Sequence, residues 1–415
     1  MNAALIDLKK ERNRRDPNPE QIIIAGAGIA GLTLAIALAA KGFSVQIFEK
    51  SEALAEIGAG LQLSPNATRL LDRLDVLRDL GPRCVEPDAI SLNDGRTGSV
   101  LLRLPMAEHA RERWGAPYLA CHRADLQNAL LQRARRDGRI AIQLRSAVMQ
   151  YESDAGSVIV RVQYDDRIEE HRAALLVGAD GVWSAIRNVQ DHHRARPTGT
   201  VAWRASVPAG ALPASFKALL AESPEITAWT GPDAHLIAYP VRSGDMINFV
   251  AVAPDRHDDR PRARAEPDLG ADFSGWHAAI LGALRSAGPW TPWQLFEMRH
   301  CRFKIGKRLV LIGDAAHAMP PYAAQGAAMA IEDACALAAL LGQNRDVERV
   351  LEQFSAQRTG RVEAVARRGA LNRLAYHARG PMALARNTLL RMRKPEKFLE
   401  GLDWLYGYDA EARNK

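Results

Sequence analysis

The chain has 415 residues, 47% apolar and 25% charged, which is ordinary for a soluble globular protein and allows two or three domains. Its 55 Lys and Arg against 48 Asp and Glu give a formal net charge of +7, which favours anions such as dinucleotide phosphates or a carboxylate substrate. The basic residues are scattered and no aromatic-interleaved basic motif is present, which argues against a nucleic acid partner.

Residues 1–19 are polar and carry charges of both signs, so we expect a disordered leader and not a secretion signal. No run approaches the ~20 apolar residues of a membrane helix, so no integral membrane segment is predicted. His192 and His193 have no further ligand at metal-binding spacing, and we expect no metal. Four cysteines without a CxxC pair indicate reduced thiols and the cytoplasm, namely Cys84, Cys121, Cys301 and Cys335.

The first signature, between residues 21 and 50, has the order strand, glycine turn, helix, strand. Residues 22–25 are a short β-branched run, which favours a buried parallel strand, and residues 44–48 form the second strand. Three glycines at GxGxxG spacing permit a tight turn, let backbone amides approach a pyrophosphate and let the helix over residues 32–40 pack closely. They are Gly26, Gly28 and Gly31. Glu49 follows 18 positions later and can accept both ribose hydroxyls, so a dinucleotide site is predicted, the alternative being an ordinary βαβ unit.

The next segments alternate between sheet and helix. Residues 89–104 form a hairpin pattern around a turn at 93–95, which we place outside the nucleotide-binding domain. Arg123 precedes a helix, where its guanidinium could grip a phosphate, or lie on the surface. We expect a meander of four strands over residues 140–144, 148–152, 157–164 and 168–171.

A second signature spans residues 174–187, where an apolar strand ends in Gly178, Asp180 and Gly181 and passes into a helix. The carboxyl end of a strand in an open parallel sheet is where ligands bind, although a simple strand-to-helix turn is the alternative. From residue 199 to 253 the pattern becomes alternating, which predicts a mostly antiparallel substrate-covering sheet.

The third signature spans residues 308–341, where a strand at 309–312 meets a Gly-Asp turn, then a proline pair, and then a long apolar helix beginning at Gly326. The amino end of that helix presents free amides to a phosphate, a carboxylate or a reduced flavin, and a kinked core helix is the alternative. Helices follow over residues 347–377 and 381–391, and the aromatic tail 404–409 could dock.

Together these pieces resemble the single-component FAD-dependent aromatic hydroxylases, through GAGIAG with Glu49, GADGVWSAIR and LIGDAAHAMPPYAAQGAAMAIEDA. They are similar in particular to the branch of salicylate hydroxylase, 3-hydroxybenzoate 6-hydroxylase and 6-hydroxynicotinate 3-monooxygenase. Residues 59–74 and 112–130 resemble that branch too, so that the similarity spans roughly residues 20–375.

The resemblance implies an FAD site, with NADH or NADPH as a transient cosubstrate. In it Arg123 would hold the pyrophosphate, Asp314 would take a ribityl hydroxyl, and residues 320–326 would flank the isoalloxazine ring. Asp180 with Arg187 would serve FAD and NAD(P)H together. The implied cofactor-binding residues are Gly26, Gly28, Gly31, Glu49, Lys50, Arg123, Asp180, Arg187, Asp314, Gln325, Gly326 and Ala327.

The implied reaction is reduction of FAD, addition of dioxygen at flavin C4a and transfer of one oxygen atom to an electron-rich ring in a dry pocket. Arg204 could pair with a substrate carboxylate or form a structural salt bridge, and His317 is expected to be structural. Several members have a histidine or tyrosine where this chain has Gln62 and Trp203. The expected pocket residues are Gln62, Trp203, His235, Tyr239, Pro320 and Tyr322.

The predicted fold is α/β, with a discontinuous Rossmann-like FAD-binding domain, an inserted mostly antiparallel substrate domain and a C-terminal helical region. The FAD-binding domain comprises residues 20–88, 105–190 and 295–345, the substrate domain 89–104 and 191–294, and the helical region 346–415. The predicted function is hydroxylation of a monocyclic aromatic acid or phenol by a cytoplasmic monomer or homodimer. The alternatives are a monooxygenase or epoxidase for a larger or non-aromatic scaffold, and a non-catalytic, redox-responsive flavoprotein.

Overall fold

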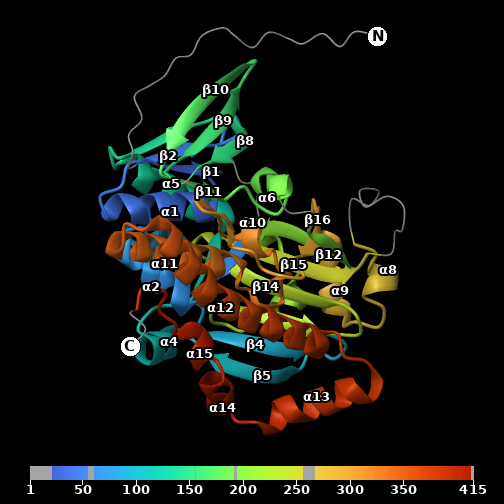
Figure 1. The fold of residues 1–415 in the computed structure, drawn as a ribbon. Helices are drawn as coiled ribbons and strands as arrows, with labels where there is room; N and C mark the ends of the chain where they lie inside the picture. The colour runs from blue at the N-terminus through green and yellow to red at the C-terminus, as the bar shows by residue number, and fades with distance from the viewer. Residues whose placement is uncertain (1–20, 55–59, 155, 191–193, 256–266, 413–415) are drawn as a thin grey trace, which may run out of the picture.

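The computed structural model describes residues 21–54, 60–154, 156–190, 194–255 and 267–412. Figure 1 shows a parallel sheet flanked by helices, a larger sheet beside it, and helix α12 (Val347–Tyr376) running in front of the larger sheet. The predicted leader and the His192–His193 pair lie outside the described residues.

The parallel sheet contains strands of all three sequence signatures. Its order is β17-β18-β11-β1-β2-β7, and every pair is parallel except β17 with β18. The strands are Lys304–Gly306, Leu309–Leu311, Leu175–Gly178, Ile22–Ala25, Val45–Phe48 and Ile140–Gln143. Helix α1 (Ile29–Ala40) packs against α5 (Arg123–Arg135) and α11 (Gly326–Gln343) beside this sheet. The predicted strand, glycine turn, helix and strand are confirmed.

One strand of the predicted meander belongs elsewhere. Strand β7 pairs in parallel with β2, with Ile140 opposite Val45 and Ile142 opposite Ile47. The helix α5 before it supplies the crossover that a parallel connection needs. The remaining three strands form a separate antiparallel sheet, namely β8 (Ser146–Ser153), β9 (Val158–Tyr164) and β10 (Arg167–Ala173).

The seven-stranded sheet has the order β16-β12-β15-β14-β13-β4-β5 and is antiparallel except for β13 with β4. The strands are Thr291–Glu297, Arg196–Pro208, Met246–Pro254, His235–Val241, Glu225–Thr230, Ala89–Asp94 and Val100–Pro105. The predicted hairpin is therefore β4–β5, and it lies in this sheet and not in the parallel one.

This sheet is buried on both faces. On the outer face, aromatic residues such as Trp229 and Phe249 form a core with α7 (Ala214–Lys217) and α9 (Ala278–Ser286). Helix α8 (Leu269–Asp272) contacts α9. On the inner face, Ala202, Tyr239 and Val252 join the core of the parallel sheet. The inner face therefore looks toward the nucleotide-binding signatures.

Short elements connect the sheets. A two-stranded sheet joins β3 (Gly60–Leu63) to β6 (Leu119–His122). The remaining helices before α11 are α2 (Pro65–Arg73), α3 (Leu77–Leu80), α4 (Ala107–Trp114), α6 (Ala185–Gln190) and α10 (Asp314–His317). Four single turns are Gly81–Arg83, Ala209–Ala211, Arg242–Gly244 and Pro321–Ala323.

Helix α11 is the one described helix long and apolar enough to span a membrane by length and composition. All of its residues from Ala328 to Leu341 are buried within the chain. Its apolar surface is already in contact with α1, α2 and α12, so this helix forms part of the protein core.

The aromatic tail docks onto the body, as predicted. The ring of Tyr406 in α15 (Asp403–Tyr406) packs against Trp114, with centroids 4.9 Å apart. Arg361 of α12 donates to the carbonyl oxygens of Trp404 and Leu405, at 2.8 and 2.9 Å. These contacts fix the tail next to the parallel-sheet core.

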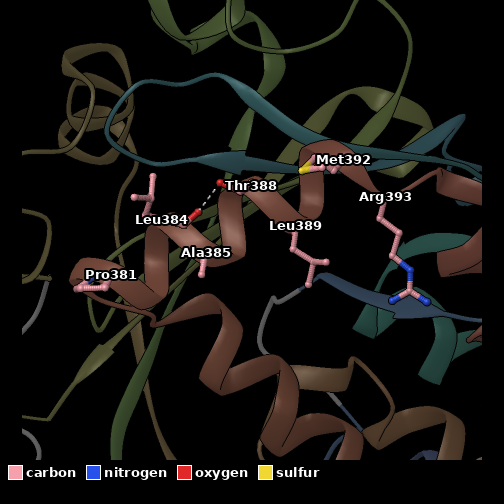
Figure 2. Close-up of a pocket in the computed structure, with 7 residues that line it drawn as sticks. All are labelled: Pro381, Leu384, Ala385, Thr388, Leu389, Met392 and Arg393. Atoms are coloured by element: carbon pink, nitrogen blue, oxygen red, sulfur yellow. Dashed lines mark hydrogen bonds between the residues drawn. The ribbon is translucent and has the colours of Figure 1, made fainter.

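Helix α13 (Gly380–Met392), followed by α14 (Pro395–Glu400), lies at the outside of the molecule (Figure 1). Its outer side forms an apolar groove of about 710 Å³, with Leu384 71% and Met392 78% exposed. The residues lining it, shown in Figure 2, are Pro381, Leu384, Ala385, Thr388, Leu389, Met392 and Arg393. None of the predicted site residues lines this groove.

Candidate functional site

The glycine turn is shaped by close packing at two of its three glycines. A Cβ at Gly31 would lie 2.0 Å from the carbonyl oxygen of Gly26, and a Cβ at Gly26 would lie 2.4 Å from that of Ala179. Gly26 also has φ +105°, which favours glycine. A Cβ at Gly28 meets no atom within 4 Å. The turn is therefore tight toward the protein and open at Gly28, the position where an approaching pyrophosphate needs space.

Glu49 lies beside this turn. Its Oε2 accepts a hydrogen bond from the backbone nitrogen of Ala27 at 2.8 Å, and its Oε1 accepts one from Ser51 at 2.9 Å. Lys50 is exposed next to it. The acid predicted from spacing is thus in contact with the predicted glycine loop.

Arg123 is the first residue of α5 and is half-buried. One turn later, Nε2 of Gln127 donates to the carbonyl oxygen of Ala27 at 3.4 Å, which ties the start of α5 to the glycine turn. The structure therefore brings Arg123 to the same region as the glycines, although nothing in the sequence spacing links them.

In the second signature, Asp180 has one carboxylate oxygen without a hydrogen-bond partner among the described residues, whereas the Arg187 guanidinium is bonded within the protein. Oδ2 of Asp180 accepts from the backbone nitrogen of Ala185 at 2.8 Å, whereas its Oδ1 is buried and has no hydrogen-bond partner among the described residues. Arg187 is 1% exposed and donates to the carbonyl oxygens of Val182 and Ala315, both at 2.8 Å. The guanidinium of Arg187 therefore joins the second signature to the third, and its contact with a dinucleotide stays a prediction.

Asp314 is exposed at the first position of α10, after Gly313 with φ +60°. The turn is held from behind by Asp333, whose Oδ2 accepts from the Gly313 backbone nitrogen at 2.9 Å and lies 2.6 Å from Nε2 of His317. Oδ1 of Asp333 accepts from Nε of Arg358 at 2.8 Å. His317 is therefore structural, as predicted, and its buried contacts orient a turn that leaves Asp314 free to face outward.

At the amino end of α11, the side chain of Gln325 is already hydrogen-bonded within the protein. Gln325 is 1% exposed, donates from Nε2 to Oγ of Ser64 at 2.8 Å and accepts from Nδ2 of Asn66 at 3.1 Å. Its side chain is therefore held within the protein, and the contact of Gln325 with a cofactor stays a prediction. Gly326 and Ala327 begin the helix without a side-chain cap, so only their backbone remains available as predicted.

Strand register separates the predicted pocket residues into two groups. His235 pairs through Val252 with Ala202, and Tyr239 through Asn248 with Ser206, so that these residues share the inner face with Arg204. Trp203 alternates to the outer face and belongs to the outer core. The prediction that Trp203 lines the same pocket is wrong, since adjacent residues of a strand point to opposite faces.

The inner-face polar groups lie close together. The guanidinium of Arg204 stacks 5.3 Å from the ring centre of Trp293. Burial raises the pKa of Tyr239, while the nearby Arg204 charge acts in the opposite direction. Tyr239 is therefore a neutral hydroxyl at pH 7 beside a permanent cation, a pairing suited to an anionic aromatic ligand.

The loop after α10 reaches this face. Tyr322 is 5% exposed, and its ring centroid lies 5.7 Å from that of His235. Pro320 is half-buried just before it. Gln62 on β3 accepts from the hydroxyl of Tyr118 at 2.8 Å, and the neighbouring Gly60 nitrogen donates to Oδ1 of Asn248 at 2.7 Å. Sheet, loop and β3 thus converge around His235 and Tyr239.

Sequence reasoning missed His377, whose Nε2 lies 2.8 Å from Nδ1 of His235. The two residues are 142 positions apart, and no local motif marks His377. It follows the last residue of α12, so only the path of that helix brings it to the inner face.

The arrangement fits bound FAD in three respects. The turn is open at Gly28, the first turn of α1 has no side-chain cap, and a buried Asp180 oxygen has no partner among the described residues. A further cavity of about 360 Å³, lined by residues such as Pro224, Pro240 and Ile247, includes none of the predicted site residues.

Comparison with known proteins agrees with this geometry. Residues 20–369 match the FAD binding domain family. A 3-hydroxybenzoate 6-hydroxylase of Polaromonas naphthalenivorans is 34% identical over 95% of this chain and 98% of its own. A 6-hydroxynicotinate 3-monooxygenase of Bordetella bronchiseptica is 31% identical over 94% and 96%.

Solved structures show the same fold. Klebsiella pneumoniae HpxO complexed with FAD and uric acid superposes with a TM-score of 0.81 at 24% identity, covering 94% of this chain and 97% of its own. A salicylate hydroxylase substrate complex gives 0.77 at 24%, covering 94% and 96%. The glycine turn, the three signatures and the matched length lead to one conclusion: the chain belongs to the FAD binding domain family.

Proposed function

We propose that this protein is an FAD-dependent monooxygenase that uses NADH or NADPH and dioxygen to hydroxylate a monocyclic aromatic acid or phenol. The relatives in the previous section are named for 3-hydroxybenzoate and 6-hydroxynicotinate, and another, from Streptomyces platensis, for 3-amino-4-hydroxybenzoate, at 34% identity. Each named substrate carries a hydroxyl group and a carboxylate on one ring. Cytoplasmic location and a monomer or homodimer are part of this proposal.

Bound FAD would accept a hydride from the nicotinamide and activate dioxygen. For the chain itself, the glycine turn and α1 would hold the pyrophosphate, with Glu49 on the ribose and Arg123 on the phosphates. Asp314 would take a ribityl hydroxyl, and the backbone of Gly326 and Ala327 would approach the ring. Asp180 retains an unused buried oxygen for the same ligand.

The observation that carries the proposal is the shared inner face of Arg204, His235 and Tyr239 opposite the Tyr322 loop. Arg204 supplies a cation for the carboxylate, and Tyr239 supplies a neutral hydroxyl that can donate to it. His235 supplies a neutral imidazole nitrogen that can take the phenol proton. Loss of that proton makes the ring richer in electrons, which is what oxygen transfer requires.

Exclusion of water is the other contribution of the chain. His235, Tyr239 and Tyr322 are each at most 5% exposed, with the inner sheet face covered by the parallel-sheet domain. Such a site keeps water from the activated oxygen and strengthens the charge pairing with Arg204. Pro320 and Gln62 border the same region and would limit the size of the ring.

The test is oxidation of NADH and NADPH by the purified flavoprotein, with and without a panel of hydroxybenzoates, hydroxypyridine carboxylates and simple phenols. Oxygenated product and hydrogen peroxide are both quantified. Stimulation with product in excess of peroxide is the expected result. Protein that carries no flavin, or flavoprotein that no monocyclic aromatic stimulates, contradicts the proposal; in the second case, stimulation by a polycyclic compound or an alkene favours the larger-scaffold alternative. Absence of any turnover favours the non-catalytic one.

A further inference from the structure

His235 and His377 form a buried pair that leads from the inner sheet face to the surface. Nδ1 of His235 lies 2.8 Å from Nε2 of His377. His235 is 2% exposed on β14, whereas His377 is half-buried where α12 ends. One imidazole is therefore enclosed and the other is in partial contact with solvent.

The groups around the pair are mostly uncharged. The ring of Tyr322 lies 5.7 Å from each imidazole, and that of Tyr376 lies 5.2 Å from His235. A cation near them is Arg373, whose guanidinium is 5.8 Å above the ring of Tyr322. Arg379, two residues after His377, forms an ion pair with Asp233. Among the described contacts of the pair, no carboxylate touches either imidazole; Asp233 contributes only its backbone nitrogen to the His377 carbonyl oxygen.

This environment favours two neutral rings. Burial, with a smaller effect of His377, lowers the pKa of His235 well below its ordinary value. Burial, followed by the charge of Arg373, lowers the pKa of His377 to about 4. Two neutral imidazoles at 2.8 Å share one proton between them, so one nitrogen donates and the other accepts.

We infer that His377 is a positioning residue that acts through His235, by accepting its Nδ1 proton and passing a proton to solvent. This inference rests on the proposed function. With Nδ1–H donated to His377, Nε2 of His235 is left without a proton and can accept one from a phenol.

The proton balance is closed along this path. The O–H bond of the phenol breaks and its proton binds Nε2 of His235, while the Nδ1 proton of His235 moves to Nε2 of His377. The Nδ1 proton of His377 then passes to water. Both imidazoles end neutral, no positive charge stays on the buried pair, and the substrate is left as its phenolate.

A structural role is the competing explanation, in which the pair only anchors the end of α12 to the sheet. The variant His377→Gln distinguishes the structural role from the proton-transfer role. A glutamine amide can keep a hydrogen bond to Nδ1 of His235 but cannot transfer a proton from it to solvent. His300→Gln, at an exposed histidine, is the matched control.

The first measurement uses apoprotein and needs no turnover. Nitrogen-15 NMR of the histidine side chains should show His235 protonated at Nδ1 and unprotonated at Nε2 at pH 7, with His377→Gln altering that resonance and His300→Gln leaving it unchanged. The opposite tautomer of His235 in the wild type overturns the inference, even if the variant fails to fold.

The second measurement follows the colour change of 4-nitrophenol on ionisation after it binds the holoenzyme, in a stopped-flow instrument. We expect His377→Gln to slow ionisation roughly 10²-fold, to change phenol affinity by less than about twofold, and to recover with added imidazole. Unchanged ionisation in His377→Gln overturns the inference and leaves the proposed function standing. A wild type that neither binds nor oxygenates any phenol or aromatic acid instead contradicts the proposed function.

Discussion

Oδ2 of Asp333 lies 2.6 Å from Nε2 of His317, and the same oxygen accepts the backbone N–H of Gly313. One buried carboxylate thus fixes both the turn that presents Asp314 and the histidine that follows it. Although burial alone raises the pKa of Asp333, the His317 and Arg358 contacts bring it below its ordinary value, so the group is ionised. The turn is consequently held by charge from within the core.

Asp333→Asn should therefore lower stability and FAD retention, although we expect no direct contact between Asp333 and FAD. The change leaves the buried Arg358 with one carboxylate fewer, which costs about 3–5 kcal/mol when a buried pair is broken. Thermal unfolding and FAD retention on gel filtration measure the result. Glu363→Gln, at an exposed ion pair 3.9 Å long, is the control and should change stability by less than about 1 kcal/mol. Equal melting temperatures for both variants would refute the assigned role of Asp333.

Alanine at Gly28 and at Gly31 should have different effects. Gly28→Ala adds a methyl group where nothing lies within 4 Å, so the apoprotein should fold normally while FAD affinity falls by roughly tenfold or more. Gly31→Ala forces a contact of 2.0 Å with a carbonyl oxygen and should destabilise the apoprotein itself. Circular dichroism melts of apoprotein and FAD titrations separate the two. Full FAD affinity in Gly28→Ala would mean that the pyrophosphate does not approach this turn.

Substitution of Trp203 should change stability, whereas substitution of Tyr239 should change ligand affinity. Trp203→Ala empties a site in the outer core, which costs about 3–5 kcal/mol, while the ligand affinity of the folded fraction stays unchanged. Tyr239→Phe keeps the buried ring but removes the hydroxyl beside Arg204, so aromatic acids should bind roughly tenfold more weakly. Urea unfolding and ligand titration of the flavin absorbance test both. A shift of substrate preference in a folded Trp203 variant would contradict the strand assignment.

The neutral histidine pair makes stability dependent on pH. The pKa of His377 is about 4 in the folded chain, below the ~6.5 of an unfolded histidine, so the unfolded state binds more protons between these values. The contribution is present above about pH 6.5 and is lost as the pH falls toward 4, by a few kcal/mol in total. His377→Gln should flatten the dependence. Denaturant unfolding at several pH values, with His300→Gln as the control, measures it; parallel curves for wild type and His377→Gln would show that His377 does not titrate in this way.

Much of the fold follows from local sequence. The β1–α1–β2 unit was predictable because its glycines, its apolar strand and Glu49 lie within 30 residues, and local backbone geometry determines their spacing. The hairpin at residues 89–104 and the alternating strands were predictable from turn residues and from a period of two.

The errors have a common origin in contacts between distant segments. Trp203 was misplaced because the seven-stranded sheet is buried on both faces, so that apolar residues occupy both sides of β12 and alternation does not tell inside from outside. Arg187 and Gln325 carry side chains suited to a ligand, and the sequence did not show that they form hydrogen bonds to the distant Ala315 and Ser64. His377 was missed because its partner His235 is 142 positions away in the sequence.

The docked tail has a consequence for how the chain is made. Arg361 is bonded to the carbonyls of Trp404 and Leu405, and Arg73, from the first quarter of the chain, contacts Asp409 at 2.6 Å. Arg73 and Asp409 are 336 positions apart, so the ribosome synthesises them at widely separated times. The surface of the nucleotide-binding half therefore stays incomplete until Asp409 has left the exit tunnel, late in the synthesis of these 415 residues.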